Sequence, residues 1–266
     1  MHITITGNLG SGKSTICRLM NEKYGFEIYS TGKIQRELAA QMNMTTLELN
    51  QLMCSDSKYD KMIDDETARI SRENRDKDII FDSRLAWHFV EHSFKVFVSV
   101  SLDVAAERVM KDKRGEVESY SSLQEAKKLL AERAATERVR YKDIYNLNYM
   151  DFNNYNLVID STFSTPELIA RIILQEAKEF YKDNEAYGRT RLLLPPARLL
   201  NPDTLSGVDE EGLKDLVEEY KKLDYKPDDI IVARKADEDY EPVSDWDKVK
   251  AALIAGVPYI QVRLVD

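Results

Sequence analysis

Close to its start the chain carries Gly7-Asn8-Leu9-Gly10-Ser11-Gly12-Lys13-Ser14, which fits the pattern G-x-x-x-x-G-K-(S/T). The segment 2–6 before it predicts a short buried strand, and residues 15–20 after it predict a helix. In such a strand–loop–helix frame, successive backbone N–H groups and the positive end of the helix dipole face one anion-sized hollow. The octapeptide therefore predicts a loop that wraps the phosphates of a nucleoside triphosphate; the alternative is a glycine-rich turn before an ordinary helix.

The side chains of this loop have expected roles. Lys13 is expected to reach the β- and γ-phosphates, and the Ser14 hydroxyl is expected to bind Mg²⁺. The other predicted nucleotide contacts come from the same segment: Gly7, Gly10, Ser11, Gly12 and Thr15.

Length and composition restrict the class of protein. The 266 residues, 43% of them hydrophobic, suffice for one large domain or for a domain with a small partner. The net charge of −9 argues against a general binder of nucleic acids or membrane surfaces, and no apolar run reaches membrane-spanning length. Cys17 and Cys54 lack metal-ligand spacing and are expected to be reduced thiols. Because a strand begins at once, no secretory signal is expected, and the prediction is a soluble, cytoplasmic protein.

Strands and helices alternate after the loop. This order predicts an α/β fold of the P-loop type, with three α/β/α layers, a parallel sheet and a helical lid. The expected strands are 27–29, 78–81, 95–100 and 156–159. The expected helices are 31–41, 45–53, 59–73, 104–111, 123–145 and 166–181, the last with Thr165 as its N-cap and Pro166 at its first position.

The composition changes after residue 182. Residues 183–191 are polar and charged, and they are expected to link a first domain, 1–182, to a small α+β module, 192–266. Within this module we expect helices over 210–223 and 246–255 and strands over 230–233 and 259–264.

Charged residues beyond the loop are candidates for phosphoryl-transfer chemistry. Asp82 follows the apolar strand 79–81, as expected of a carboxylate beside Mg²⁺, although an aspartate there is also a common helix cap. Arg84 lies two residues further on, and Arg133 and Arg140 are seven residues apart on one predicted helix face. Such cations neutralise the charge that develops during transfer. The alternative is a solvated helix with Glu–Arg pairs such as that of Arg133 and Glu137.

In the order of these segments the first 180 residues resemble cytidylate kinases, especially the short archaeal-type, cytidylate-kinase-like branch of the nucleoside monophosphate kinases. The matching segments are 7–14, 30–37, 81–87, 107–108 and 132–141. The resemblance implies a kinase fold, ATP as phosphoryl donor, Mg²⁺ as cofactor and CMP or dCMP as acceptor.

The resemblance also implies residue roles. Thr31, Arg36 and Arg84 would grip the acceptor monophosphate, and Arg108, Arg133 and Arg140 would belong to the lid over both nucleotides. We count Arg108 with the substrate-binding residues. The catalytic set is Lys13, Asp82, Arg133 and Arg140, and the metal ligands are Ser14 and Asp82.

Two residues depart from the family pattern. Lys33 stands where the family usually has an aspartate near the metal, and Ser83 replaces the usual glycine beside Asp82. The main hypothesis is therefore ATP-dependent phosphorylation of CMP or dCMP. The alternatives are a nucleotide-binding regulatory pseudokinase and a kinase of another small acceptor.

The C-terminal module has a resemblance of its own. Residues 192–266 are similar to the ParB/sulfiredoxin-like fold. Where that family carries an aspartate-glycine-x-histidine/asparagine-arginine phosphate motif, this chain has Ser244-Asp245-Trp246-Asp247-Lys248. The loss of the glycine and the arginine predicts a degenerate module that serves a protein partner, self-association or regulation. No membrane partner is expected, and nucleic acid is not an expected partner.

Overall fold

The computed structural model describes residues 1–44, 48–49, 52–53, 58–111, 120–202, 210–237 and 239–265. The side chains of five helical residues also fall outside this description: Lys33, Arg36, Glu37, Leu38 and Glu210. Most of the helix predicted over 45–53, and Cys54, therefore lie outside the described residues.

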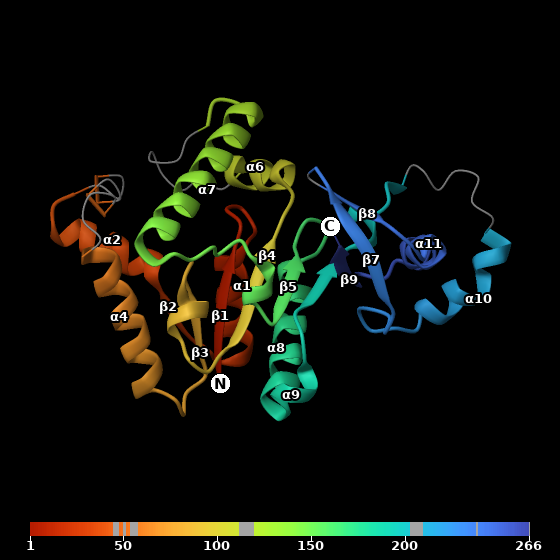
Figure 1. The fold of residues 1–266 in the computed structure, drawn as a ribbon, viewed down its shortest axis with the longest axis horizontal. Coiled ribbons are helices and arrows are strands. Elements are labelled where there is room, and N and C mark those ends of the chain that lie inside the picture. Colours follow the sequence, from red (N-terminus) through yellow and green to blue (C-terminus); the bar gives the residue numbers. More distant parts are fainter. Residues whose placement is uncertain are drawn as a thin grey trace.

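One sheet runs across the molecule (Figure 1). Within the described ranges it has nine strands in the spatial order β2-β3-β1-β4-β5-β6-β9-β7-β8. The strands are β1 (His2–Gly7), β2 (Glu27–Ser30), β3 (Ile79–Asp82), β4 (Phe94–Ser99), β5 (Leu157–Asp160), β6 (Arg191–Leu194), β7 (Ile230–Ala236), β8 (Asp239–Pro242) and β9 (Ile260–Val265). From β2 to β6 all neighbours are parallel, so the predicted parallel sheet is confirmed.

Helices cover both faces of this sheet, which confirms the predicted α/β fold class. The helices of the described residues are α1 (Lys13–Tyr24), α2 (Thr31–Gln41), α4 (Lys58–Glu73), α5 (Ala86–Phe89), α6 (Leu102–Lys111), α7 (Leu123–Tyr145), α8 (Pro166–Lys182), α9 (Asn184–Tyr187), α10 (Glu210–Tyr220) and α11 (Trp246–Ala255). Short 3₁₀ turns occur at Phe152–Asn154 and Pro196–Arg198. Among the described helices, none is both long enough and apolar enough to cross a bilayer.

Alternate side chains of the central strands enter two different cores. Val96 and Val98 of β4 pack with α1 and α8 on one face, whereas Phe97 between them packs on the other face. That second core also holds Leu213 of α10 and Val249 of α11. We call residues 192–265 the C-terminal part of the chain. Its helices therefore share a core with β4 and β5.

The C-terminal strands extend the same sheet. β6 pairs in parallel with β5, and β9 then pairs antiparallel with β6, followed by β7 and β8. Strand β8 was not predicted from the sequence. The segment predicted as a linker holds α9, whose Tyr187 is buried and donates a hydrogen bond to Glu176 (2.7 Å). The division into domains 1–182 and 192–266 stays a prediction, as does the ParB/sulfiredoxin-like resemblance.

Candidate active site

The phosphate loop joins β1 to α1, as predicted. Gly7, Gly10 and Gly12 all have positive φ angles, of 154°, 75° and 84°. A Cβ on Gly7 would lie 2.2 Å from the carbonyl oxygen of Val98, and one on Gly10 would lie 2.7 Å from that of Ala105. The loop thus lies directly against β4 and α6, where only glycine fits at these two positions.

Gly7→Ala is expected to lower the free energy of unfolding by about 3 kcal/mol or more, because overlap with the backbone of β4 adds to an unfavourable φ. It should also abolish ATP binding. Gly25→Ala is the matched control: Gly25 has a φ of 77°, but a Cβ added there would meet no atom within 4 Å, so about 1–2 kcal/mol is expected and ATP binding should persist. Urea unfolding and calorimetry measure both quantities. Intact ATP binding by Gly7→Ala would contradict this view of the loop.

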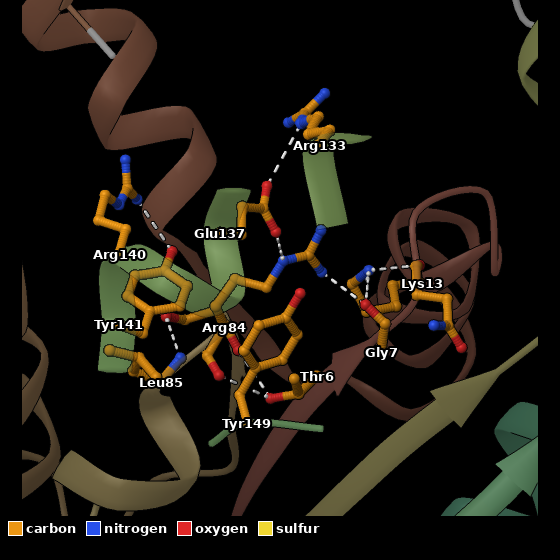
Figure 2. A network of polar contacts seen from close by, with 12 residues as sticks. Thr6, Gly7, Lys13, Arg84, Leu85, Arg133, Glu137, Arg140, Tyr141 and Tyr149 are labelled. Atoms are coloured by element: carbon orange, nitrogen blue, oxygen red, sulfur yellow. Dashed lines mark hydrogen bonds and ion pairs between the residues drawn. The ribbon is translucent and has the colours of Figure 1, made fainter. Parts of the chain in front are cut away.

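Lys13 is folded over its own loop. Its Nζ donates to the carbonyl oxygens of Gly7 and Asn8, both at 3.2 Å (Figure 2). Burial lowers the pKa of Lys13, and the nearby Arg84 lowers it further, to about 7, against the opposing charges of Asp82 and Glu137. A bound polyphosphate would favour the protonated amine, so the position suits a phosphate-binding lysine.

The oxygen atoms around the loop fit a nucleotide and its magnesium ion. The Ser11 hydroxyl is buried and has no hydrogen-bond partner within the part of the chain that the structure describes. Ser14 is exposed in the first turn of α1, and Asp82 ends β3, which is paired in register with β1 through Ile5. A hydroxyl and a carboxylate are the hard oxygen ligands that Mg²⁺ prefers.

The predicted acceptor residues are only partly visible. The Thr31 hydroxyl lies 3.5 Å from the carbonyl oxygen of Asp82, at the same edge of the sheet. Arg36 and Lys33 lie on α2, but their side chains are outside the described residues, so their roles stay predictions. Ser83 is buried, and its hydroxyl accepts a hydrogen bond from the backbone N–H of Leu85 (3.4 Å).

Arg84 connects the phosphate loop to the long helix α7. Its Nη1 donates to the carbonyl oxygen of Gly7 (2.6 Å), and its Nε pairs with Glu137 (2.9 Å). The other carboxylate oxygen of Glu137 accepts from Arg133 (3.3 Å) (Figure 2). Burial alone would raise the pKa of Glu137, but the guanidinium groups of Arg84 and Arg133 outweigh it and hold that pKa below its ordinary value. Two of the predicted arginines thus meet at Glu137, and one of them, Arg84, shares the carbonyl oxygen of Gly7 with Lys13.

Arg140 and Arg108 lie elsewhere. Arg140 is directed toward α4, where it lies 3.6 Å from the Asp60 carboxylate and donates to the Tyr141 hydroxyl (3.1 Å). Arg108 donates to the carbonyl oxygen of Gly10 (3.4 Å) and to Ser161 (3.0 and 2.6 Å). Arg140 is therefore directed toward α4 and is not a member of the Arg84–Glu137–Arg133 group. Arg108 is not a member either, but it contacts the phosphate loop at Gly10.

Comparison with known proteins agrees with this geometry. The family model described as "Cytidylate kinase-like family" matches residues 2–163. The chain belongs to this family. Membership makes it a nucleoside monophosphate kinase-like phosphotransferase, which confirms the predicted enzyme class.

Relatives named cytidylate kinase match more than half of this chain. The protein of Methanobrevibacter smithii is 32% identical over 178 residues, 67% of this chain and 99% of that protein. The protein of Natronomonas pharaonis is 35% identical over 192 residues, 71% of this chain and 95% of that one. Among solved structures, shikimate kinase from Bacteroides thetaiotaomicron gives a TM-score of 0.46 at 13% identity, covering 68% of this chain and 98% of that one.

A pair of buried carboxyl groups in this kinase-like chain was not predicted. Asp60 and Asp64 lie one turn apart on the buried face of α4. The Tyr145 hydroxyl of α7 donates to Asp64 Oδ2 (2.5 Å). Burial raises the pKa of Asp64 to about 7, and the neighbouring Asp60 contributes to the increase, whereas the Tyr145 hydrogen bond and Arg140 oppose it.

Asp64→Asn is expected to stabilise the protein at pH 8 by up to about 4 kcal/mol, since each pKa unit corresponds to about 1.4 kcal/mol. The folded pKa of about 7 lies above the ordinary 3.8, so the wild type loses stability as pH rises between these values. The variant should lack this loss. Urea unfolding from pH 4 to 8 measures it, with exposed Asp76→Asn as control. Parallel pH profiles for wild type and Asp64→Asn would refute the expectation.

Glu137 and the buried aspartates of α4 were missed in the sequence for different reasons. Glu137 was recognised in the sequence only as a helical partner of Arg133, because its other partner, Arg84, is 53 residues away. Asp60, Asp64 and Thr67 follow the helical period and are all buried, which is a visible pattern, but a polar stripe on a helix ordinarily indicates solvent.

Proposed function

We propose that this chain is an ATP-dependent kinase of nucleoside monophosphates, with CMP or dCMP as its acceptor. The observation that carries the proposal is the Arg84–Glu137–Arg133 group, in which Arg84 shares the carbonyl oxygen of Gly7 with the lysine of the phosphate loop and Arg133 joins Arg84 through Glu137. The names of the relatives support the choice of a cytidine nucleotide. A phosphate loop alone would equally suit a switch or a motor protein.

In the proposed reaction an oxygen of the acceptor phosphate attacks the γ-phosphorus of ATP. The bond from that phosphorus to the oxygen bridging it to the β-phosphate breaks, and ADP leaves with the bond's electron pair. Lys13 and the loop N–H groups would hold the β- and γ-phosphates, while Arg84 and Arg133 would stabilise the charge of the transferred group. Ser14 and Asp82 would hold Mg²⁺, whose positive charge would neutralise part of the charge of the donor phosphates.

A coupled assay of ADP release tests the proposal with CMP, dCMP, UMP, AMP and GMP as acceptors. We expect CMP or dCMP to stimulate ADP release with the highest kcat/KM of the five nucleotides. Stimulation only by another nucleotide would reassign the acceptor. No stimulation by any of the five, together with tight ATP binding, would support the regulatory pseudokinase instead.

Two further expectations stay predictions beside this proposal. One is a cytoplasmic location. The other is that residues 192–266 bind a protein partner or mediate self-association.

A further inference from the structure

A buried ion pair joins the C-terminal part of the chain to the end of β5. Arg198, in the 3₁₀ turn after β6, is only 5% exposed, and Asp160 at the end of β5 is 1% exposed. The Arg198 Nη1 lies 3.6 Å from Asp160 Oδ2 and donates to the hydroxyl of Thr162 (3.0 Å). On its other side, Arg198 Nε pairs with Asp239 of β8 (2.9 Å).

We call residues 160–162 the β5 turn. Its conformation is fixed by hydrogen bonds: Thr162 N–H donates to Asp160 Oδ1 (2.9 Å), and the Ser99 hydroxyl donates to Asp160 Oδ2 (3.0 Å). The C-terminal part adds a second contact, because the hydroxyl of Tyr259 donates to the carbonyl oxygen of Asp160 (2.9 Å). The β5 turn is thus held from the side of β4 and from the side of the C-terminal part.

The β5 turn also binds Arg108, which contacts the phosphate loop. Arg108 of α6 donates to the hydroxyl and the carbonyl oxygen of Ser161, at 3.0 and 2.6 Å. The same guanidinium group donates to the carbonyl oxygen of Gly10 (3.4 Å). A continuous series of contacts therefore runs from Arg198 through the β5 turn and Arg108 to the phosphate loop.

Loss of the Arg198 guanidinium would remove the ion-pair partner that the C-terminal part supplies to Asp160. The charge of Arg108 would still act on this buried carboxylate. Because a buried carboxylate that loses its ion-pair partner is costly, we expect the β5 turn to rearrange or admit water. Arg108 donates two hydrogen bonds to Ser161 and one to the carbonyl oxygen of Gly10, so we expect a rearranged turn to shift Arg108 and to loosen its contact with Gly10. The Arg84–Glu137–Arg133 group contacts the loop at Gly7 and includes no residue of this series.

We propose that Arg198 is a positioning residue for the donor nucleotide, so that the C-terminal part of the chain sets the affinity of the phosphate loop for ATP. The inference rests on the proposed function only in taking this loop as the ATP site. It assigns to the C-terminal part a role within the same polypeptide, in addition to any partner it binds.

Calorimetry on the full chain tests this, with Mg²⁺ and a nonhydrolysable ATP analogue in one series and CMP in another. We expect Arg198→Gln to weaken binding of the analogue on the order of tenfold, the size usual for coupling between sites. CMP binding should weaken clearly less, because Arg108 contacts the phosphate loop at Gly10 but is also counted with the substrate-binding residues. Arg198→Lys should recover part of the loss. Arg171→Gln is the matched control, because Arg171 of α8 pairs with Asp224 (2.8 Å) between the same two parts of the chain, at an exposed position.

Wild-type affinity of Arg198→Gln for the analogue would overturn the inference, as would an equal loss for analogue and CMP or an equal loss in Arg171→Gln. Should circular dichroism show that Arg198→Gln does not fold, Tyr259→Phe takes its place, with a smaller selective loss of analogue binding expected and wild-type binding overturning the inference. A wild type that binds the analogue but phosphorylates no nucleoside monophosphate would contradict the proposed function alone, since the calorimetric comparison does not depend on turnover.

Discussion

Lys13→Ala is expected to lower kcat for phosphoryl transfer by about 100- to 1000-fold, the usual cost of removing one preorganised group that stabilises a transition state. The side chain lies over the phosphate loop, with Nζ 3.2 Å from the carbonyl oxygens of Gly7 and Asn8. Among the lysines whose side chains the structure describes, no other donates to this loop. Initial rates at saturating ATP and acceptor measure the effect.

Lys23→Ala serves as the control, because Lys23 lies in the last turn of the same helix α1 and is exposed. It should keep kcat within about twofold, as expected of a surface substitution away from the site. Equal rates for Lys13→Ala and Lys23→Ala would show that the loop lysine takes no part in the reaction.

Arg84→Gln is expected to lower the free energy of unfolding by about 3–5 kcal/mol, because it leaves the Glu137 carboxylate buried without its main partner. Both side chains are largely buried, with 16% and 15% of their surfaces exposed. Glu137→Gln should destabilise for the converse reason, and the double variant should lose less than the two single losses together. Urea unfolding of the four proteins gives the coupling free energy.

The exposed pair of Arg69 and Glu66 on α4 provides the control cycle, with 50% and 41% of the side chains exposed. Its coupling should stay below about 1 kcal/mol, as for other surface ion pairs. Strictly additive losses for Arg84 and Glu137 would contradict the view that this pair is the connection between α7 and the loop. Turnover should not return in the double variant, because Arg84 is needed for the transferred phosphate as well as for stability.

The parts of the fold that depend on local sequence were predictable. The glycines of residues 7–14 impose the loop, and the strand and helix on either side follow from hydrophobic periodicity. Thr165 and Pro166 were recognised as the start of α8, where the Thr165 hydroxyl accepts from the N–H of Leu168. Asp82 was placed correctly at the end of an apolar strand; that this strand, β3, pairs with β1 is known only from the structure.

The parts that depend on distant pairing were not predictable. Asp160 and Arg198 are separated by 38 positions in sequence, and neither belongs to a motif. Likewise, residues 230–265 read as strands and a helix, but no local pattern shows that β9 pairs with β6 and so extends the sheet of the kinase-like part. Which charged residue meets which is decided by packing between elements, not by spacing along one of them.

Transfer of the γ-phosphate from radiolabelled [γ-³²P]ATP in the presence of Mg²⁺ and CMP or dCMP is the most direct measurement, with products separated by thin-layer chromatography. The residues around Lys13, Arg84 and Arg133 predict label in CDP or dCDP, which should depend on the acceptor and form far more slowly in Lys13→Ala. Label that stays in ATP, or that appears only as inorganic phosphate, would contradict a kinase of these monophosphates.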